Sequence, residues 1–206
     1  MAPLGLYVAA SLALIATPGQ DMLYVIARSL AQGRWAGLCS AFGVCLGILV
    51  HTALAALGVG ALLRASETLF LALKLAGAAY LVYLGARLLA SRAPRAQDAA
   101  PMRPLSPRAL VAQGMLSNVS NPKIVVFFMA FLPQFIDPAS AHPTRDLVAL
   151  GVLYAAMALP VKGAVAWIAG TLARRAQPSL AALAWAQRAG GAILVLLGIR
   201  LAAGAR

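Results

Sequence analysis

Long apolar segments alternate with short polar ones along most of the 206 residues. A helix that crosses a bilayer needs roughly 20 mostly apolar residues. Six runs are of this kind, and they cover about residues 4–26, 36–62, 68–90, 109–135, 147–171 and 185–203. Because a helix satisfies its own backbone hydrogen bonds in lipid, the pattern predicts an all-α bundle of six membrane-spanning helices.

One polar segment, residues 91–108, is longer than the other connections. It is rich in Pro and Arg and has no apolar periodicity, which is typical of a linker. The linker separates residues 1–90 from residues 109–206, and each part contains three apolar runs. We therefore expect one integral membrane domain made of two three-helix units, with short loops joining antiparallel neighbours.

The composition supports a membrane protein, since 62% of the residues are hydrophobic and 11% are charged. A soluble domain is about half apolar and about a quarter charged. The net charge is +12, but the basic residues lie between the apolar runs, which favours contact with membrane lipid and not with nucleic acid. Two cysteines, Cys39 and Cys45, and two isolated histidines have no metal-ligand spacing, so we expect no metal and no cofactor.

The basic residues are unequally divided between the two sides of a six-span arrangement. One side has Arg28, Arg34, Arg87, Arg92, Arg95, Arg103, Arg108, Arg174, Arg175 and Arg188, whereas the other has Arg64, Arg145, Arg200 and Arg206. The Arg-rich side should be cytoplasmic. The linker and the 27–35 turn are then cytoplasmic and both termini periplasmic. If 109–135 is a re-entrant pair instead of one span, everything after it is reversed.

Two segments of the chain are similar to each other. Residues 77–90 read GAAYLVYLGARLLA and residues 190–203 read GGAILVLLGIRLAA, so nine of fourteen positions are identical. Chance similarity between two Leu/Ala/Gly-rich segments is the alternative explanation. Because each unit has three spans, an odd number, the two units would face opposite ways across the membrane. The pattern predicts a 3+3 inverted repeat, a common plan of transporters.

Two of the spans are interrupted at corresponding places, by TPGQD (17–21) and by SNVSNPK (117–123). Proline has no N–H and its ring clashes with the carbonyl of the preceding turn, so each interruption frees backbone groups. Paired broken spans in two inverted units point to a binding site at the membrane midplane, although a plain proline kink is the alternative. The candidate substrate and coupling residues are Pro18, Gly19, Gln20, Asp21, Asn118, Asn121, Pro122 and Lys123.

Asp21 is the only acidic residue well inside a predicted span. A charge there costs roughly 3 kcal/mol or more, so such a residue usually faces a cavity or a partner. It could hold a substrate ammonium or carry a coupling proton, and it could also cap the half-helix that begins near Gln20. Lys123 could pair with a substrate carboxylate or with Asp21.

Three further residues are secondary candidates. Lys74 lies near the start of a span, where snorkelling to the interface is favoured. Lys162 lies deeper and is the better cavity residue, with cytoplasmic snorkelling as its alternative. His51 is more often a helix–helix hydrogen-bonding residue than a proton relay. Gly43 and Gly47 form GxxxG, a pattern of close helix packing.

Three motifs together resemble the LysE/RhtB family of amino acid exporters. They are TPGQDMLYV (17–25), GAAYLVYLG (77–85) and NPKIVVFFMAFLPQF (121–135), and the similarity extends over essentially the whole chain. The resemblance implies a bacterial inner-membrane protein with six spans that exports amino acids or related compounds, driven by the proton motive force. The family usually has Pro-Gly-Pro, whereas this chain has Gln20 at the second proline.

Alternative functions would require sequence features that this chain does not show. Transport of a divalent cation would favour several intramembrane carboxylates, and an intramembrane enzyme using Ser40, Ser117 or Ser120 with His51 lacks any supporting motif. A membrane scaffold does not explain paired breaks with charges beside them. We therefore expect a secondary transporter, not an enzyme, whose partners are an amino acid and protons. A single carboxylate favours a neutral amino acid, and the Gly-rich faces also allow a homodimer.

Overall fold

The computed structural model describes residues 4–65, 67–90, 103–137, 140–172 and 180–203, and within these ranges the chain forms helices and no strands. The first half contains α1 (Leu4–Ala16), α2 (Gln20–Gln32), α3 (Arg34–Ala65) and α4 (Glu67–Ala90). The second half contains α5 (Pro107–Val119), α6 (Pro122–Val126), the π-helix η2 (Phe127–Phe131), the 3₁₀-helix η3 (Leu132–Phe135), α7 (Pro143–Leu172) and α8 (Leu180–Ala203). The prediction of an all-α fold is confirmed.

Several helices are suited to crossing a membrane. Two qualify individually by length and apolar character, α3 over Arg34–Gly58 and α7 over Pro143–Leu172. Two bent pairs, α1 with α2 and α5 with α6 to η3, also qualify if each pair is one span, which makes up to four spans among the described residues. The runs 68–90 and 185–203 coincide with α4 and α8, each 24 residues long. Six spans remain a prediction.

The fourth apolar run is less regular than the sequence pattern indicated. After the break it continues as only five residues of α-helix, then widens into η2 and tightens into η3. Pro133 lies at the start of η3. It has no N–H to donate and its ring would clash with the carbonyl four residues earlier, at Met129, which accounts for the change of helix type at this point.

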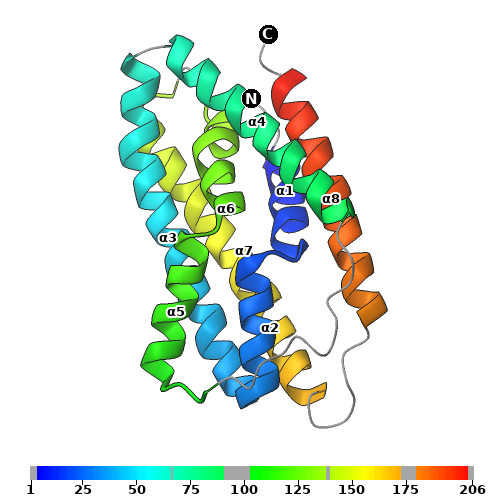
Figure 1. Cartoon of the computed structure of the whole chain (residues 1–206). Coiled ribbons are helices and arrows are strands. Elements are labelled where there is room, and N and C mark those ends of the chain that lie inside the picture. The colour runs from blue at the N-terminus through cyan, green and yellow to red at the C-terminus, as the bar shows by residue number, and fades with distance from the viewer. Residues whose placement is uncertain (1–3, 66, 91–102, 138–139, 173–179, 204–206) are drawn as a thin grey trace.

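The broken helices are arranged as two stacked pairs. In Figure 1, α1 and α6 lie in the upper half of the bundle, whereas α2 and α5 lie below them. The start of α1 and the end of α8 are at the same, upper end, as expected if both termini lie on one side. Both chain breaks are therefore near mid-height, where α1 passes into α2 and α5 into α6.

Glycines allow α3 and α5 to approach each other closely. A Cβ placed on Gly43 would collide with the backbone carbonyl of Val111, and one on Gly114 would collide with the carbonyl of Ser40. A Cβ on Gly47 would lie 2.8 Å from the Cβ of Asn118. The GxxxG pattern therefore is a close-packing face, as predicted, and its partner is α5.

The contacts between α4 and α8 are reciprocal. A Cβ on Gly85 would lie 2.5 Å from the carbonyl oxygen of Gly191, and one on Gly198 would lie 2.7 Å from that of Ala78. The two contacts are equivalent, because Gly85 and Gly198 are 113 positions apart and so are Ala78 and Gly191. The two similar segments, 77–90 and 190–203, are separated by the same 113 positions. A two-fold arrangement produces such an exchange of contacts, because residue i meets j while j meets i.

Aromatic rings fill the core beside the second break. Phe127 lies 5.1 Å from Phe131 and from Tyr154 between ring centroids, and Phe128 lies 5.4 Å from Tyr154. All four side chains are buried. Because large rings make extensive van der Waals contact and favourable ring–ring geometry, they hold η2 against α7.

Candidate functional site

The helix is interrupted between α1 and α2 as predicted, but Asp21 is not the N-cap of α2. α1 ends at Ala16, α2 begins at Gln20, and the two axes differ by 49°. The N-cap residue is Gly19, with no side-chain cap hydrogen bond. The alternative that Asp21 caps α2 is therefore wrong. Asp21 lies in the first turn, and its Oδ1 accepts a 3.0 Å hydrogen bond from the N–H of Met22.

The second break is capped by a side chain. Asn121 is the N-cap of α6, and its Oδ1 accepts a 3.1 Å hydrogen bond from the N–H of Lys123. Pro122 occupies the first helical position, where a missing N–H costs nothing. The axes before and after this break differ by 54°. Short polar residues and proline thus specify this break locally.

The two breaks meet at the carboxylate of Asp21, which is fully buried. Its Oδ2 accepts hydrogen bonds from Nζ of Lys162 at 2.8 Å and from Nδ2 of Asn118 at 3.3 Å. Its Oδ1 accepts one from Nδ2 of Asn121 at 3.0 Å. A buried charge is tolerated when it is paired and hydrogen-bonded in this way. Residues from α2, α5, the second break and α7 are therefore joined at one group.

Lys162 comes from the middle of α7, and it is only 2% exposed. This placement fits the interpretation of Lys162 as an interior residue and not the alternative of snorkelling to the surface. It lies two positions after Pro160, which α7 accommodates without ending. Lys162 is the ion-pair partner of Asp21, and the sequence had suggested Lys123 for that role.

Lys123 has a different set of partners. Its Nζ donates hydrogen bonds to the carbonyl oxygens of Leu14 at 3.1 Å and Thr17 at 3.0 Å. These carbonyls lie at the C-terminal end of α1, where the helix dipole is negative and carbonyls lack intrahelical partners. A lysine of the second break thus holds the end of the first half-helix.

A cavity of about 470 Å³ lies between the two breaks. We call it the break cavity. It is lined by Pro18, Gly19, Gln20, Leu23, Leu84, Leu88, Asn121, Pro122 and Lys123. Six of the eight predicted site residues therefore line it, whereas Asp21 and Asn118 lie in the adjoining buried network. The volume is within the roughly 300–1,000 Å³ typical of small-molecule sites.

A second hollow of about 600 Å³ continues from the break cavity along α2 and α5. The two share Gln20 and Leu23, and polar groups of Tyr24, Gln113 and Ser117 line the continuation. Polar side chains along a groove between two spans are typical of a water-filled route and not of a lipid-facing surface. We call this hollow the α2–α5 groove.

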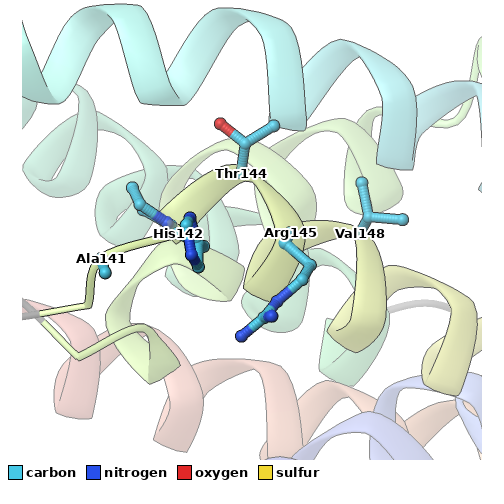
Figure 2. Close-up of a pocket in the computed structure, with 6 residues that line it drawn as sticks. Ala141, His142, Thr144, Arg145 and Val148 are labelled. Atoms are coloured by element: carbon cyan, nitrogen blue, oxygen red, sulfur yellow. The ribbon is translucent and has the colours of Figure 1, made fainter.

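The other two candidates lie outside the break cavity. His51 is buried on α3, and its Nε2 is 3.2 Å from the carbonyl oxygen of Asn118, which makes the predicted helix–helix hydrogen bond. Lys74 is half-buried on α4, and its function stays a prediction. Figure 2 shows a third hollow at the start of α7, with His142 and Arg145 in its wall. Of the described residues that line it, none belongs to either break.

One buried polar cluster was missed by the sequence reasoning, which treated Arg28 as a loop charge. Arg28 is 7% exposed and donates hydrogen bonds to Gln113 at 3.0 Å and to the carbonyl of Arg103 at 3.1 Å. Gln32 exchanges two 3.1 Å hydrogen bonds with the backbone of Leu105. The spacing of Arg28 and Gln32, one helical turn apart, was the available signal. The cluster holds the end of the linker and α5 against α2.

Two apolar helices of spanning length, together with two bent helix pairs around a shared cavity and a buried ion pair, are typical of a multi-pass membrane transporter. The chain belongs to the family of LysE type translocators, whose model matches residues 12–204. Members of this family are transporters and not enzymes, which agrees with the sequence reasoning. No solved structure matches the chain.

Curated relatives share part of their length with this chain. It is 39% identical over 152 residues to an uncharacterised membrane protein of Pseudomonas aeruginosa, covering 71% of this chain and 70% of the relative. It is 38% identical over 135 residues to one of Vibrio cholerae, covering 66% and 65%. A leucine efflux protein of Salmonella typhimurium is 30% identical over 136 residues, covering 66% and 64%. Together these similarities support amino acid export at a general level.

Proposed function

We propose that this protein exports amino acids or closely related compounds across the bacterial inner membrane, binding them in the break cavity. The observation that carries the proposal is that both helix breaks line one cavity beside the buried Asp21–Lys162 pair. Broken helices offer backbone groups and dipole ends to a ligand at the midplane of a transporter. Membership of a translocator family and similarity to leucine efflux proteins support the same class of substrate.

The architecture that we propose has six spans, built as an inverted repeat of residues 1–90 and 109–206. Three observations support it: the similar segments, the matched breaks, and the reciprocal contacts of Gly85 and Gly198. In such a transporter one unit rocks against the other around a fixed site. The Asp21 network joins residues of both units, so it is well placed to respond to that motion.

We further propose that transport is coupled to protons through Asp21. Among the described residues it is the acidic side chain that lies buried in a span, and all its partners are donors. Uptake of a proton by the carboxylate would remove its attraction for Lys162 and one acceptor site, and so loosen α7 from α2. Alternating access requires a change of this kind in the relative stability of two states.

The orientation follows from the distribution of arginine. The end of the bundle that carries Arg28, Arg34 and Arg103 is proposed to be cytoplasmic, with both termini periplasmic. The α2–α5 groove then runs from the break cavity toward the cytoplasm. An exporter needs such a route for substrates entering from the cell interior.

The test is transport by the purified full chain in proteoliposomes, using a panel of labelled amino acids and an imposed proton gradient. We expect gradient-driven flux of at least one amino acid above that of protein-free liposomes. Absence of flux for the whole panel, with folded protein present in the vesicles, would overturn the proposal.

A pair of glycine variants links this flux to the break cavity. Gly19→Leu should abolish it, because a Cβ at Gly19 already lies 3.0 Å from Nζ of Lys123 and the rest of the side chain fills the cavity. Gly19 has φ −140° and ψ −174°, which any residue adopts, so the variant tests space and not backbone strain. Gly58→Leu is the control, since a Cβ there has no atom within 4 Å. Equal flux in the two variants would place the substrate elsewhere.

A further inference from the structure

The charges around the break cavity do not balance. The carboxylate of Asp21 is paired with Lys162 at 2.8 Å and accepts three further hydrogen bonds, so it has little capacity left for a substrate cation. Lys123 is a second buried ammonium, 3% exposed, and its hydrogen-bond acceptors are the neutral carbonyls of Leu14 and Thr17. The site formed by these three side chains has an excess of one positive charge.

The side chain of Lys123 is buried and lines the break cavity. A lysine has three N–H donors, and two of those on Lys123 are directed at α1 carbonyls. Gly19 lies next to both this ammonium and the carboxylate of Asp21. A Cβ at Gly19 would lie 3.0 Å from Nζ of Lys123 and 3.5 Å from Oδ1 of Asp21. A side chain at Gly19 would therefore crowd the Lys123 ammonium, and glycine leaves it without that obstruction.

Apart from Lys123, Gln20 and Asn121, the residues that line the cavity are apolar. Leu23 of α2 faces the cavity together with Leu84 and Leu88, which are one turn apart on α4. No acidic side chain is among the described residues that line it. The amide of Gln20 offers an acceptor oxygen, which suits the α-ammonium of an amino acid. An ammonium or guanidinium at the end of a substrate side chain would meet leucines and a lysine.

We propose that the break cavity selects zwitterionic amino acids with uncharged, aliphatic side chains and rejects lysine and arginine. The substrate carboxylate binds Nζ of Lys123, and the side chain packs against Leu84 and Leu88. This inference rests on the proposed export function and specifies its substrate. An unpaired cation in this site would be opposed both by Lys123 and by loss of its water, whereas an aliphatic side chain gains from burial.

Counterflow measures this selectivity directly. Purified protein in proteoliposomes is loaded with unlabelled leucine, and entry of labelled leucine, alanine, lysine or arginine is followed. We expect leucine counterflow at least about tenfold above that of lysine or arginine, a ratio within the range that pocket chemistry commonly achieves. Lysine counterflow equal to or above that of leucine would overturn the inference while leaving amino acid export intact. Absence of counterflow for every amino acid would instead count against the proposed function.

A charge placed on the apolar wall should alter the preference. Leu88→Asp adds a carboxylate next to the position of the substrate side chain, so lysine counterflow should increase and leucine counterflow should decrease, each by severalfold. Leu88→Asn is the matched control, because it has the same size and polarity without the charge, and it should not admit lysine. If both variants admit lysine equally, or if neither changes the ratio at normal membrane abundance, Leu88 does not face the substrate side chain and the inference fails.

Discussion

The carboxylate of Asp21 and the ammonium of Lys162 are 2.8 Å apart, although 141 positions separate the two residues in the chain. The side chains are only 1% and 3% exposed. Removing one member of a buried pair leaves the other charge without compensation, which typically costs about 3–5 kcal/mol. Removing both members leaves neither charge of the pair without its partner. The pair therefore couples α2 to α7 in a way that mutants can measure.

A double-mutant cycle tests this coupling. We expect Lys162→Met to lower the thermal stability of the detergent-solubilised protein by several degrees or more, and Asp21→Asn/Lys162→Met to restore much of it. Arg145→Met is the control, because the Arg145–Asp146 pair is 3.8 Å long with Arg145 77% exposed. An exposed pair contributes about 0–1 kcal/mol. Additive losses in the double variant would show that the two charges do not stabilise each other.

Asp21→Asn should separate proton coupling from substrate passage. An amide has nearly the size of the carboxylate but cannot take up and release a proton, so gradient-driven export should be lost while equilibrium exchange is retained. Flux with and without an imposed proton gradient measures the difference, at matched amounts of inserted protein. Because Lys162 loses its counter-charge in this variant, Asp21→Asn/Lys162→Met should be assayed beside it. Gradient-driven export near that of the parent in both variants would exclude Asp21 as the coupling group.

The contact of α3 with α5 should be intolerant of side chains. Gly43→Val places methyl groups against the backbone carbonyl of Val111, which cannot move without displacing α5. Overpacking of this kind typically costs about 1–3 kcal/mol, and backbone collisions cost more. Thermal stability in detergent should fall for Gly43→Val and remain near the parent value for Gly58→Val, where the added atoms meet open space. Equal stability of the two variants would mean that the helices are farther apart.

Reporter fusions can determine the orientation. A reporter inserted at Ala99, in the linker and outside the described residues, should be active in the cytoplasm. A reporter at the C-terminus should be active in the periplasm, because three spans would separate the two positions. If both fusions report the same compartment, the number of spans after the linker is even, and the inverted repeat is wrong.

Local sequence specifies where the helices stop at the two breaks and which helix faces pack closely. Pro18 and Gly19 end α1, and Asn121 and Pro122 begin α6, because missing donors and small side chains act on the backbone within one turn. Gly43 and Gly47 likewise mark a close contact wherever a neighbouring helix meets them. Such properties depend on a few adjacent residues, so they can be predicted from the chain alone.

The groups that meet at the breaks depend on how the helices pack in three dimensions. Asp21 pairs with Lys162 and not with Lys123, because α7 packs against α2 and brings a residue from mid-helix to the carboxylate. Lys123 instead donates to the carbonyls of Leu14 and Thr17 at the end of α1. Leu84 and Leu88 line the cavity because α4 passes beside it. These partners are chosen by how helices distant in sequence cross, and hydrophobic periodicity along one helix does not specify the neighbour that its polar side chains will reach.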